Sequence, residues 1–209
     1  MVKGLKPTAM KNEVPEQHEG RKMDTTAKAI FPSIAAARQF YAIAKSRLLN
    51  VYNWAEICKV PLSVFTLTDD TGATVRREAK EGDYLKIDIP GPGTDAGNGF
   101  DWVRIEKITE ESDGINTSIS LQARPAVNPL GDDIAIAHFF KDAATSTFQI
   151  KQIGNEVWAE EHGRNEVPNT DTPSTGDNWR NRIVGWTAAI GLSYPQWKSL
   201  VKGLVETEN

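Results

Sequence analysis

Apolar and polar residues alternate through the middle of the chain, from about residue 63 to residue 161. In residues 84–89, the apolar side chains Leu85, Ile87 and Ile89 occupy every second position, and residues 102–106 and 115–122 repeat this period of two. Successive side chains of a strand point to opposite faces of a sheet. Each segment is therefore predicted to be a half-buried strand with one apolar and one polar face.

Turn residues divide this region into further strands. The segment Asp69-Asp70-Thr71-Gly72 predicts a hairpin between residues 65–68 and 73–76. Gly154-Asn155 predicts a turn between strands around residues 147–153 and 156–161. The pattern as a whole predicts about six or seven strands, most of them antiparallel.

Helices are predicted before, within and after the strand region, where apolar residues repeat every three or four positions. Ser33 can cap a helix whose apolar positions repeat every three or four residues as far as Leu48. Asp132 can cap a short helix that runs to Phe140. Near the C-terminus, apolar positions predict two helices, separated by a turn at Gly191-Leu192-Ser193.

Together these elements predict an α+β protein, in which a long N-terminal helix and two C-terminal helices accompany a curved, mainly antiparallel sheet. Residues 1–26 are polar, and we expect a flexible arm there because little apolar surface is available to offset the entropy of ordering. The α+β core is expected over residues 27–162. A loop at residues 163–176 and a helical hairpin at residues 177–209, packed on the core, are expected to follow.

Composition narrows the classes of function. The 209 residues carry 24 basic and 28 acidic side chains, and a net charge of -4 provides no global positive field for nucleic acid. The single cysteine, Cys58, excludes an internal disulfide and a cysteine-based zinc site. No stretch has the apolar length of a membrane span, and the first residues lack the apolar run of a signal peptide. We therefore expect a soluble, cytoplasmic protein without a metal or cofactor.

The glycine-rich segment at residues 90–99 suggests two ligand hypotheses. Closely spaced glycines let backbone amides approach a phosphate, but Ala96 stands where a dinucleotide fingerprint has its third glycine, and no P-loop lysine follows. Asp95, Asn98 and Asp101 could approach calcium, although their spacing differs from that of an EF-hand. We expect a long hairpin loop, and the sequence leaves open whether it has a function.

The polar face of the predicted sheet carries large aromatic and basic side chains. Trp102, Arg104, Arg124 and Trp158 are candidates for an exposed binding surface, because aromatic rings supply contact area and arginines supply directional donors. The alternative is a solvated face with cross-strand charge pairs.

His162, Arg164 and Glu166 form a second candidate group at the end of the last predicted strand. An imidazole, a guanidinium and a carboxylate this close in sequence could bind an anion or transfer a proton. The alternative is a solvated strand end with one ion pair. The sequence has neither a Gly-x-Ser-x-Gly nor a His-Glu-x-x-His motif, so no catalytic residue is assigned, and a non-enzyme is favoured. His138, beside Phe139 and Phe140, is expected to have a packing role.

The C-terminal helices suggest a third type of site. The turn at Gly191 and the helix after it resemble part of a helix-turn-helix, whose turn glycine has a positive φ. Few basic residues lie nearby and the chain is acidic, so DNA binding is the least favoured alternative.

Three segments carry a family resemblance: GDYLKIDIPGPG at residues 82–93, FDWVRIE at residues 100–106 and HGRNEVPN at residues 162–169. They resemble an uncharacterised bacterial family of hypothetical proteins, and this resemblance implies no activity and no site residue. A helix, curved antiparallel strands and a closing helix are more loosely similar to helix-grip, START-like ligand binders.

The leading hypothesis is therefore a soluble, non-catalytic binding or interaction protein that uses the sheet face or an end of the sheet and could form homo-oligomers. The second is a small-molecule cavity between the sheet and helices that carry Tyr41, Trp186 and Trp197. An enzyme using the His162 segment and DNA binding by the C-terminal helices are further alternatives. Neither the ligand, the partner, the oligomeric state nor the covered face of the sheet follows from the sequence.

Overall fold

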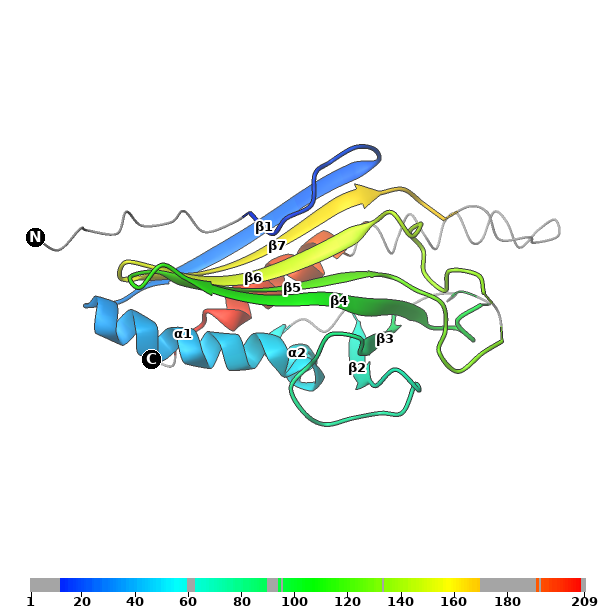
Figure 1. Ribbon diagram of the computed structural model, residues 1–209, viewed down its shortest axis with the longest axis horizontal. Coiled ribbons are helices and arrows are strands. Elements are labelled where there is room, and N and C mark those ends of the chain that lie inside the picture. The colour runs from blue at the N-terminus through cyan, green and yellow to red at the C-terminus, as the bar shows by residue number, and fades with distance from the viewer. Residues whose placement is uncertain are drawn as a thin grey trace, which may run out of the picture.

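The computed structural model describes residues 12–59, 63–89, 94, 96–132, 134–169, 191 and 193–207. Its described residues include one seven-stranded antiparallel sheet and helices that lie along one face of it (Figure 1). The predicted α+β class is therefore confirmed. Among these residues, no helix has the length and apolar character needed to cross a membrane.

The sheet is a meander with one additional edge strand. Its spatial order is β1-β7-β6-β5-β4-β3-β2, so each strand from β2 to β6 pairs with the next one along the chain, and β1 pairs with β7. Register shifts in β1 and in β4 mark irregularities of the β-bulge type, which increase strand bending. The strands are β1 (Arg21–Ile30), β2 (Val64–Thr68), β3 (Tyr84–Asp88), β4 (Asp101–Ser112), β5 (Thr117–Pro125), β6 (Thr145–Ile153) and β7 (Glu156–Glu166).

The helices separate β1 from β2 and follow β7. α1 (Ile34–Leu49) begins after Ser33, whose hydroxyl accepts a hydrogen bond from Ala36 N at 3.1 Å, as predicted for an N-cap. The turn η1 (Val51–Asn53) and the short helix α2 (Trp54–Ile57) lead to β2. Residues 193–204 form a C-terminal helix. Arg47 of α1 donates hydrogen bonds to the carbonyls of Gly203, Leu204 and Glu206 at the C-terminal end of this helix, where a positive charge complements the helix dipole.

The main core lies between these helices and the inner face of the sheet. Alternate residues of the strands, such as Ile119 and Leu121 of β5 and Phe148 and Ile150 of β6, point into it. Trp54 of α2 is fully buried, with its ring centre 5.1 Å from that of Phe148. The alternation read from residues 84–89, 102–106 and 115–122 therefore identified inner side chains such as Leu85, Ile105 and Leu121 correctly.

Several boundaries differ from expectation because long-range pairing overrides local composition. Residues 21–26, expected in a flexible arm, belong to β1, which pairs with β7 and buries Met23 and Thr25. The same pairing extends β7 through Glu166, into the segment expected to be a loop. The hairpin expected around residues 69–72 is confined to the bridge between Thr68 and Thr74 and a backbone hydrogen bond from Val75 N to Leu67 O, and the strand that pairs with β2 along its length is β3.

The helix expected between Asp132 and Phe140 is also wrong. The described residues there are not helical, and Phe140 forms a bridge with Pro168. Gly191 is helical and is not among the glycines with positive φ, so the described residues do not show the expected turn glycine. Residues 177–190, which include the first expected C-terminal helix, lie outside the described ranges.

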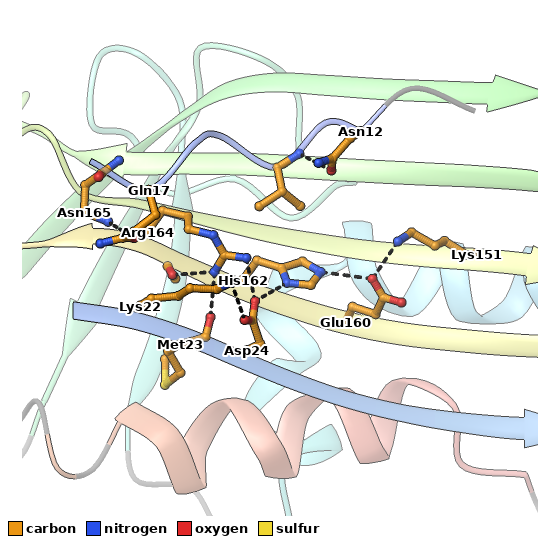
Figure 2. Close-up of polar contacts among 12 residues, drawn as sticks. Asn12, Gln17, Lys22, Met23, Asp24, Lys151, Glu160, His162, Arg164 and Asn165 are labelled. Carbon is orange, nitrogen blue, oxygen red and sulfur yellow. Dashed lines mark hydrogen bonds and ion pairs between the residues drawn. The ribbon is translucent and has the colours of Figure 1, made fainter. Parts of the chain in front are cut away.

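Residues 12–20, the N-terminal segment, cross the outer face of the sheet (Figure 2). Lys107 of β4 pairs with Glu13 at 2.5 Å. On β7, Asn165 accepts a hydrogen bond from His18 N at 2.7 Å and its own amide donates to Gln17. This segment therefore spans the sheet from β4 to β7 on the side away from the helices.

Candidate functional site

A cavity of about 60 Å³ lies between the inner face of the sheet and the C-terminal helix. Residues 138–144 of the loop before β6 close one side, and Ser193 and Gln196 of the C-terminal helix contribute polar atoms. Most of its wall is aliphatic or aromatic. The principal apolar side chains are Trp54, Phe65, Leu85, Ile87, Val103, Phe139, Phe140, Phe148 and Trp197.

Glu166 is the only carboxylate side chain among the described residues that line this cavity. Its side chain is 3% exposed, and Arg21 Nε lies 3.8 Å from its Oε2. Burial raises the pKa of Glu166 to about 7, although the charges of Arg21 and Arg164 act in the opposite direction. The cavity therefore holds a carboxyl group that changes charge near neutral pH.

The backbone at Asn165 explains why Glu166 faces the cavity. Regular alternation from the inward Ala159 and Glu161 would place residue 166 on the outer face. Asn165 instead adopts a left-handed φ of 55°, and its side chain accepts hydrogen bonds from the N-terminal segment on the outer face. The strand alternation is broken at this residue, and Glu166 turns inward.

His138 lines the same cavity as a packed, neutral side chain. Burial lowers its pKa to about 3. Its Nδ1 accepts a hydrogen bond from Phe140 N at 2.9 Å, and its ring is stacked 4.3 Å from that of Phe139. These contacts agree with the packing role expected from the sequence.

His162 and Arg164 lie together on the outer face, where Asp24 of β1 joins them (Figure 2). Asp24 Oδ1 is 2.6 Å from His162 Nδ1 and 2.6 Å from Arg164 Nη2. Glu160 Oε2 lies 3.0 Å from the other imidazole nitrogen. Burial raises the pKa of Asp24, but hydrogen bonds from His162 and Arg164 outweigh this effect and hold it below its usual value.

The structure thus divides the expected group of His162, Arg164 and Glu166. The first two side chains form an ion-paired cluster outside the sheet, whereas Glu166 lines the inner cavity. A joint catalytic role for the three is not supported by this arrangement.

Loop residues cover part of the sheet face that was expected to expose aromatic side chains. Trp102 is 1% exposed, so its expected exposure is wrong. It packs with Ala96 and Ala137, and its Nε1 donates to Gly97 O at 3.4 Å. A Cβ at Gly97 would collide with the carbonyl of Phe100. The described part of the glycine-rich segment is therefore a cover for Trp102, while residues 90–93 and 95 lie outside the described ranges.

The other candidates of the outer face lie in separate environments. Arg104 is exposed, and Arg124 donates to Glu106 Oε1 at 2.8 Å. Trp158 is half-buried beneath Lys28, whose Nζ is 4.6 Å from the ring centre. These side chains do not form one continuous aromatic patch with the buried Trp102.

Of the aromatic residues expected around a cavity, Trp197 lines it. Tyr41 is not among the lining residues, and its hydroxyl donates to Glu110 at 3.3 Å. Trp186 lies outside the described residues.

Glu161 was not among the site residues expected from the sequence. This β7 residue has no exposed surface, and neither carboxylate oxygen has a hydrogen-bond partner among the described residues. Burial raises its pKa well above the usual value, and the charges of Glu166 and Asp24 act in the same direction. A signal was present in the sequence, because Glu161 continues the apolar phase of Val157 and Ala159.

The chain matches no protein-family model and no curated protein sequence. Protein Ms6760 from Mycobacterium smegmatis is 15% identical, with a TM-score of 0.38 over 90% of this chain and 92% of that one. Major latex-like protein 151 from Panax ginseng is 13% identical, with a TM-score of 0.36 over 84% of this chain and 99% of that one. A protein from Arthrobacter aurescens is 13% identical, with a TM-score of 0.36 over 89% and 88%. Structural likeness at this level assigns neither a family nor a function to the chain.

Proposed function

We propose that this chain binds a small, mainly apolar molecule in the cavity between the sheet and the C-terminal helix. The observation that carries the proposal is an aromatic and aliphatic wall that surrounds one buried carboxyl group, Glu166. Small-molecule sites combine apolar surface for affinity with a few polar groups that orient the ligand. The role proposed is binding without catalysis.

The size of the cavity limits the ligand. A volume of about 60 Å³ is well below the ~300–1,000 Å³ typical of sites for drug-sized ligands. A short aliphatic group fits this space. A larger ligand would require movement of the C-terminal helix, which contributes Ser193, Gln196 and Trp197 to the wall.

An interaction role through the outer face has less support. Trp102 is buried, and Arg124, His162 and Arg164 form hydrogen bonds or ion pairs within the chain. Arg104 remains exposed, but one exposed arginine does not define a partner. DNA binding was suggested by a turn glycine with positive φ at Gly191. Gly191 is instead helical, so this support for DNA binding is lost.

The proposal can be tested with n-butanol as a neutral probe in an NMR titration. We expect saturable shifts at Trp54, Phe148 and Trp197, which line the cavity. The variant Ala144→Leu should fill part of the cavity and weaken binding at least tenfold, because Ala144 is a lining residue with 2% exposure.

The control is Ala35→Leu, which adds the same carbon atoms at an exposed position of α1. It should leave the titration unchanged. Shifts that never saturate, or that survive in a folded Ala144→Leu variant, would contradict binding in this cavity.

A further inference from the structure

Two glutamates of β7 lie next to one another on the inner face of the sheet. Glu161 pairs in register with Phe148 of β6, which lines the cavity, and with Thr25 of β1. Gly163 is the next inward residue along β7. A Cβ at Gly163 would collide with Glu166 Oε1, so the carboxyl group of Glu166 occupies the space that Gly163 leaves empty. Glu161 and Gly163 are about 7 Å apart along the strand, and the charge of Glu166 acts on Glu161, so we treat the two carboxyl groups as neighbours.

These groups offer acceptor atoms that no side chain or backbone group in the described part of the chain uses. Glu161 Oε1, Glu161 Oε2, Glu166 Oε2 and Thr25 Oγ1 are buried and have no hydrogen-bond partner among the described residues. Arg21 approaches Glu166 Oε2 only to 3.8 Å, beyond hydrogen-bond distance. An unpartnered buried polar atom destabilises a fold, more so when it carries charge. The arrangement is therefore unfavourable until donors enter it.

The number and type of unused atoms select the chemistry of the missing donor. An alkylammonium group has three N–H donors and no acceptor. It can donate to both carboxyl groups at once and neutralise one negative charge. A hydroxyl group has a single donor, and a carboxylate has none, so either would leave most of these acceptors unpaired.

We propose that the ligand of this cavity is a primary amine with a short apolar body, and that its ammonium group binds between Glu161 and Glu166. This inference rests on the proposed function and specifies its ligand class. Glu166 contacts the ligand from the cavity wall, and Glu161 supplies the second carboxyl group from the adjacent inward position on β7, losing its proton when the ammonium group binds.

Charges around the pair shape the dependence of binding on pH. β1 contributes Arg21 and Asp24, β7 contributes Arg164, and the neutral His138 faces the cavity from the loop before β6. Ser193, Gln196 and Trp197, the described cavity residues of the C-terminal helix, have no ionisable side chain. Burial raises the pKa of Glu166 to about 7, so an ammonium ion that binds at lower pH must displace a proton. Its affinity should fall about tenfold per pH unit for each proton displaced.

The test compares n-butylamine with n-butanol and butyrate, which share a short alkyl body and differ in the polar end. Each is titrated into the full chain at pH 7.5, with NMR detection of the side-chain carboxyl carbons of glutamate. We expect n-butylamine to bind at least tenfold more tightly than n-butanol, and butyrate to bind most weakly. The carboxyl carbons of Glu161 and Glu166 should shift in the direction of deprotonation with n-butylamine alone.

Glu161→Gln and Glu166→Gln should each reduce the ratio of amine to alcohol affinity to within about threefold, whereas the exposed Glu78→Gln should preserve it. Loss of amine affinity between pH 7 and pH 5, with constant alcohol affinity, supports the proposal without any variant. If n-butanol binds in the cavity and n-butylamine binds no better, the amine inference is overturned, and the proposed function stands. If neither probe binds, both proposals fail.

Discussion

Glu166→Gln should make the stability of this protein less sensitive to pH. The pKa of Glu166 is raised by burial from its usual 4.5 to about 7 in the folded chain. A carboxyl group with a raised folded-state pKa stabilises the fold fully below pH 4.5. That stabilisation is lost as the pH rises to about 7, because the unfolded chain loses its proton first. Glutamine has no proton to lose and should remove this loss.

The magnitude follows from the difference in pKa. At about 1.4 kcal/mol per pKa unit, the wild-type chain should lose roughly 2 to 3 kcal/mol through Glu166 between pH 5 and pH 8. The free energy of unfolding of Glu166→Gln relative to the wild type should therefore rise by this amount over the same interval. Removing the charge of Glu166 also favours ionisation of Glu161 in the fold, which acts in the same direction.

Other buried groups titrate in this range, but they are common to both proteins. The pKa of His138 is lowered to about 3 by burial, which weakens the fold as the pH falls below 6.5. Burial raises the pKa of Asp101 to about 7, which has the same sign as Glu166. Comparing variant with wild type at each pH cancels both contributions, provided that the substitution leaves their surroundings unchanged.

Urea unfolding at half-unit steps from pH 5 to pH 8, followed by tryptophan fluorescence, measures this difference. Glu78→Gln, at an exposed position, is the matched control and should give a curve parallel to that of the wild type. Parallel curves for Glu166→Gln and wild type would refute the reasoning, since they would mean that Glu166 has the same pKa in the folded and unfolded chains.

Two further substitutions test the outer face of the sheet by urea unfolding. Trp102→Ala should destabilise the fold by about 3 to 5 kcal/mol, because the ring is fully buried. The control Arg104→Ala, at an exposed position, should change the free energy of unfolding by no more than about 0.5 kcal/mol. Similarly small effects of both substitutions would contradict the burial of Trp102 beneath the loop. Asp24→Ala should destabilise the fold by about 1 to 2 kcal/mol, because the buried Arg164 loses its carboxylate partner; solvent screening keeps this value small, since the Asp24 side chain is 44% exposed. The control Lys22→Ala removes only an exposed partner of Asp24 and should have little effect. Equal effects of the two substitutions would show that the fold does not depend on the pair between Arg164 and Asp24.

Local patterns in the sequence were sufficient for much of the fold. Alternation identified most strands of the meander, and the Ser33 cap and helical spacing located α1. β1 escaped detection because its segment, Arg21–Ile30, has few large apolar residues and is ordered by pairing with β7. The non-helical path of residues 134–140 likewise depends on long-range contacts, such as the bridge between Phe140 and Pro168.

The candidate site was less accessible to sequence reasoning. Glu166 was singled out, but as a partner of His162 and Arg164, which lie on the opposite face of the sheet. Glu161 could have been found, since a glutamate in the apolar phase of a strand is unusual. The cavity itself depends on residues from six strands, two helices and a loop, whose proximity no local pattern reveals.

The sequence by itself determined the fold class, the inner and outer phase of most strands and the position of α1, because side-chain periodicity follows directly from backbone geometry. Only the tertiary structure decided what covers each face. One left-handed residue, Asn165, directs Glu166 to the cavity, and a loop distant from β7 buries Trp102. Burial and charge environment arise from groups brought together by the whole fold, so the raised pKa of Glu166 and the burial of both Glu161 carboxyl oxygens are properties of the packed chain.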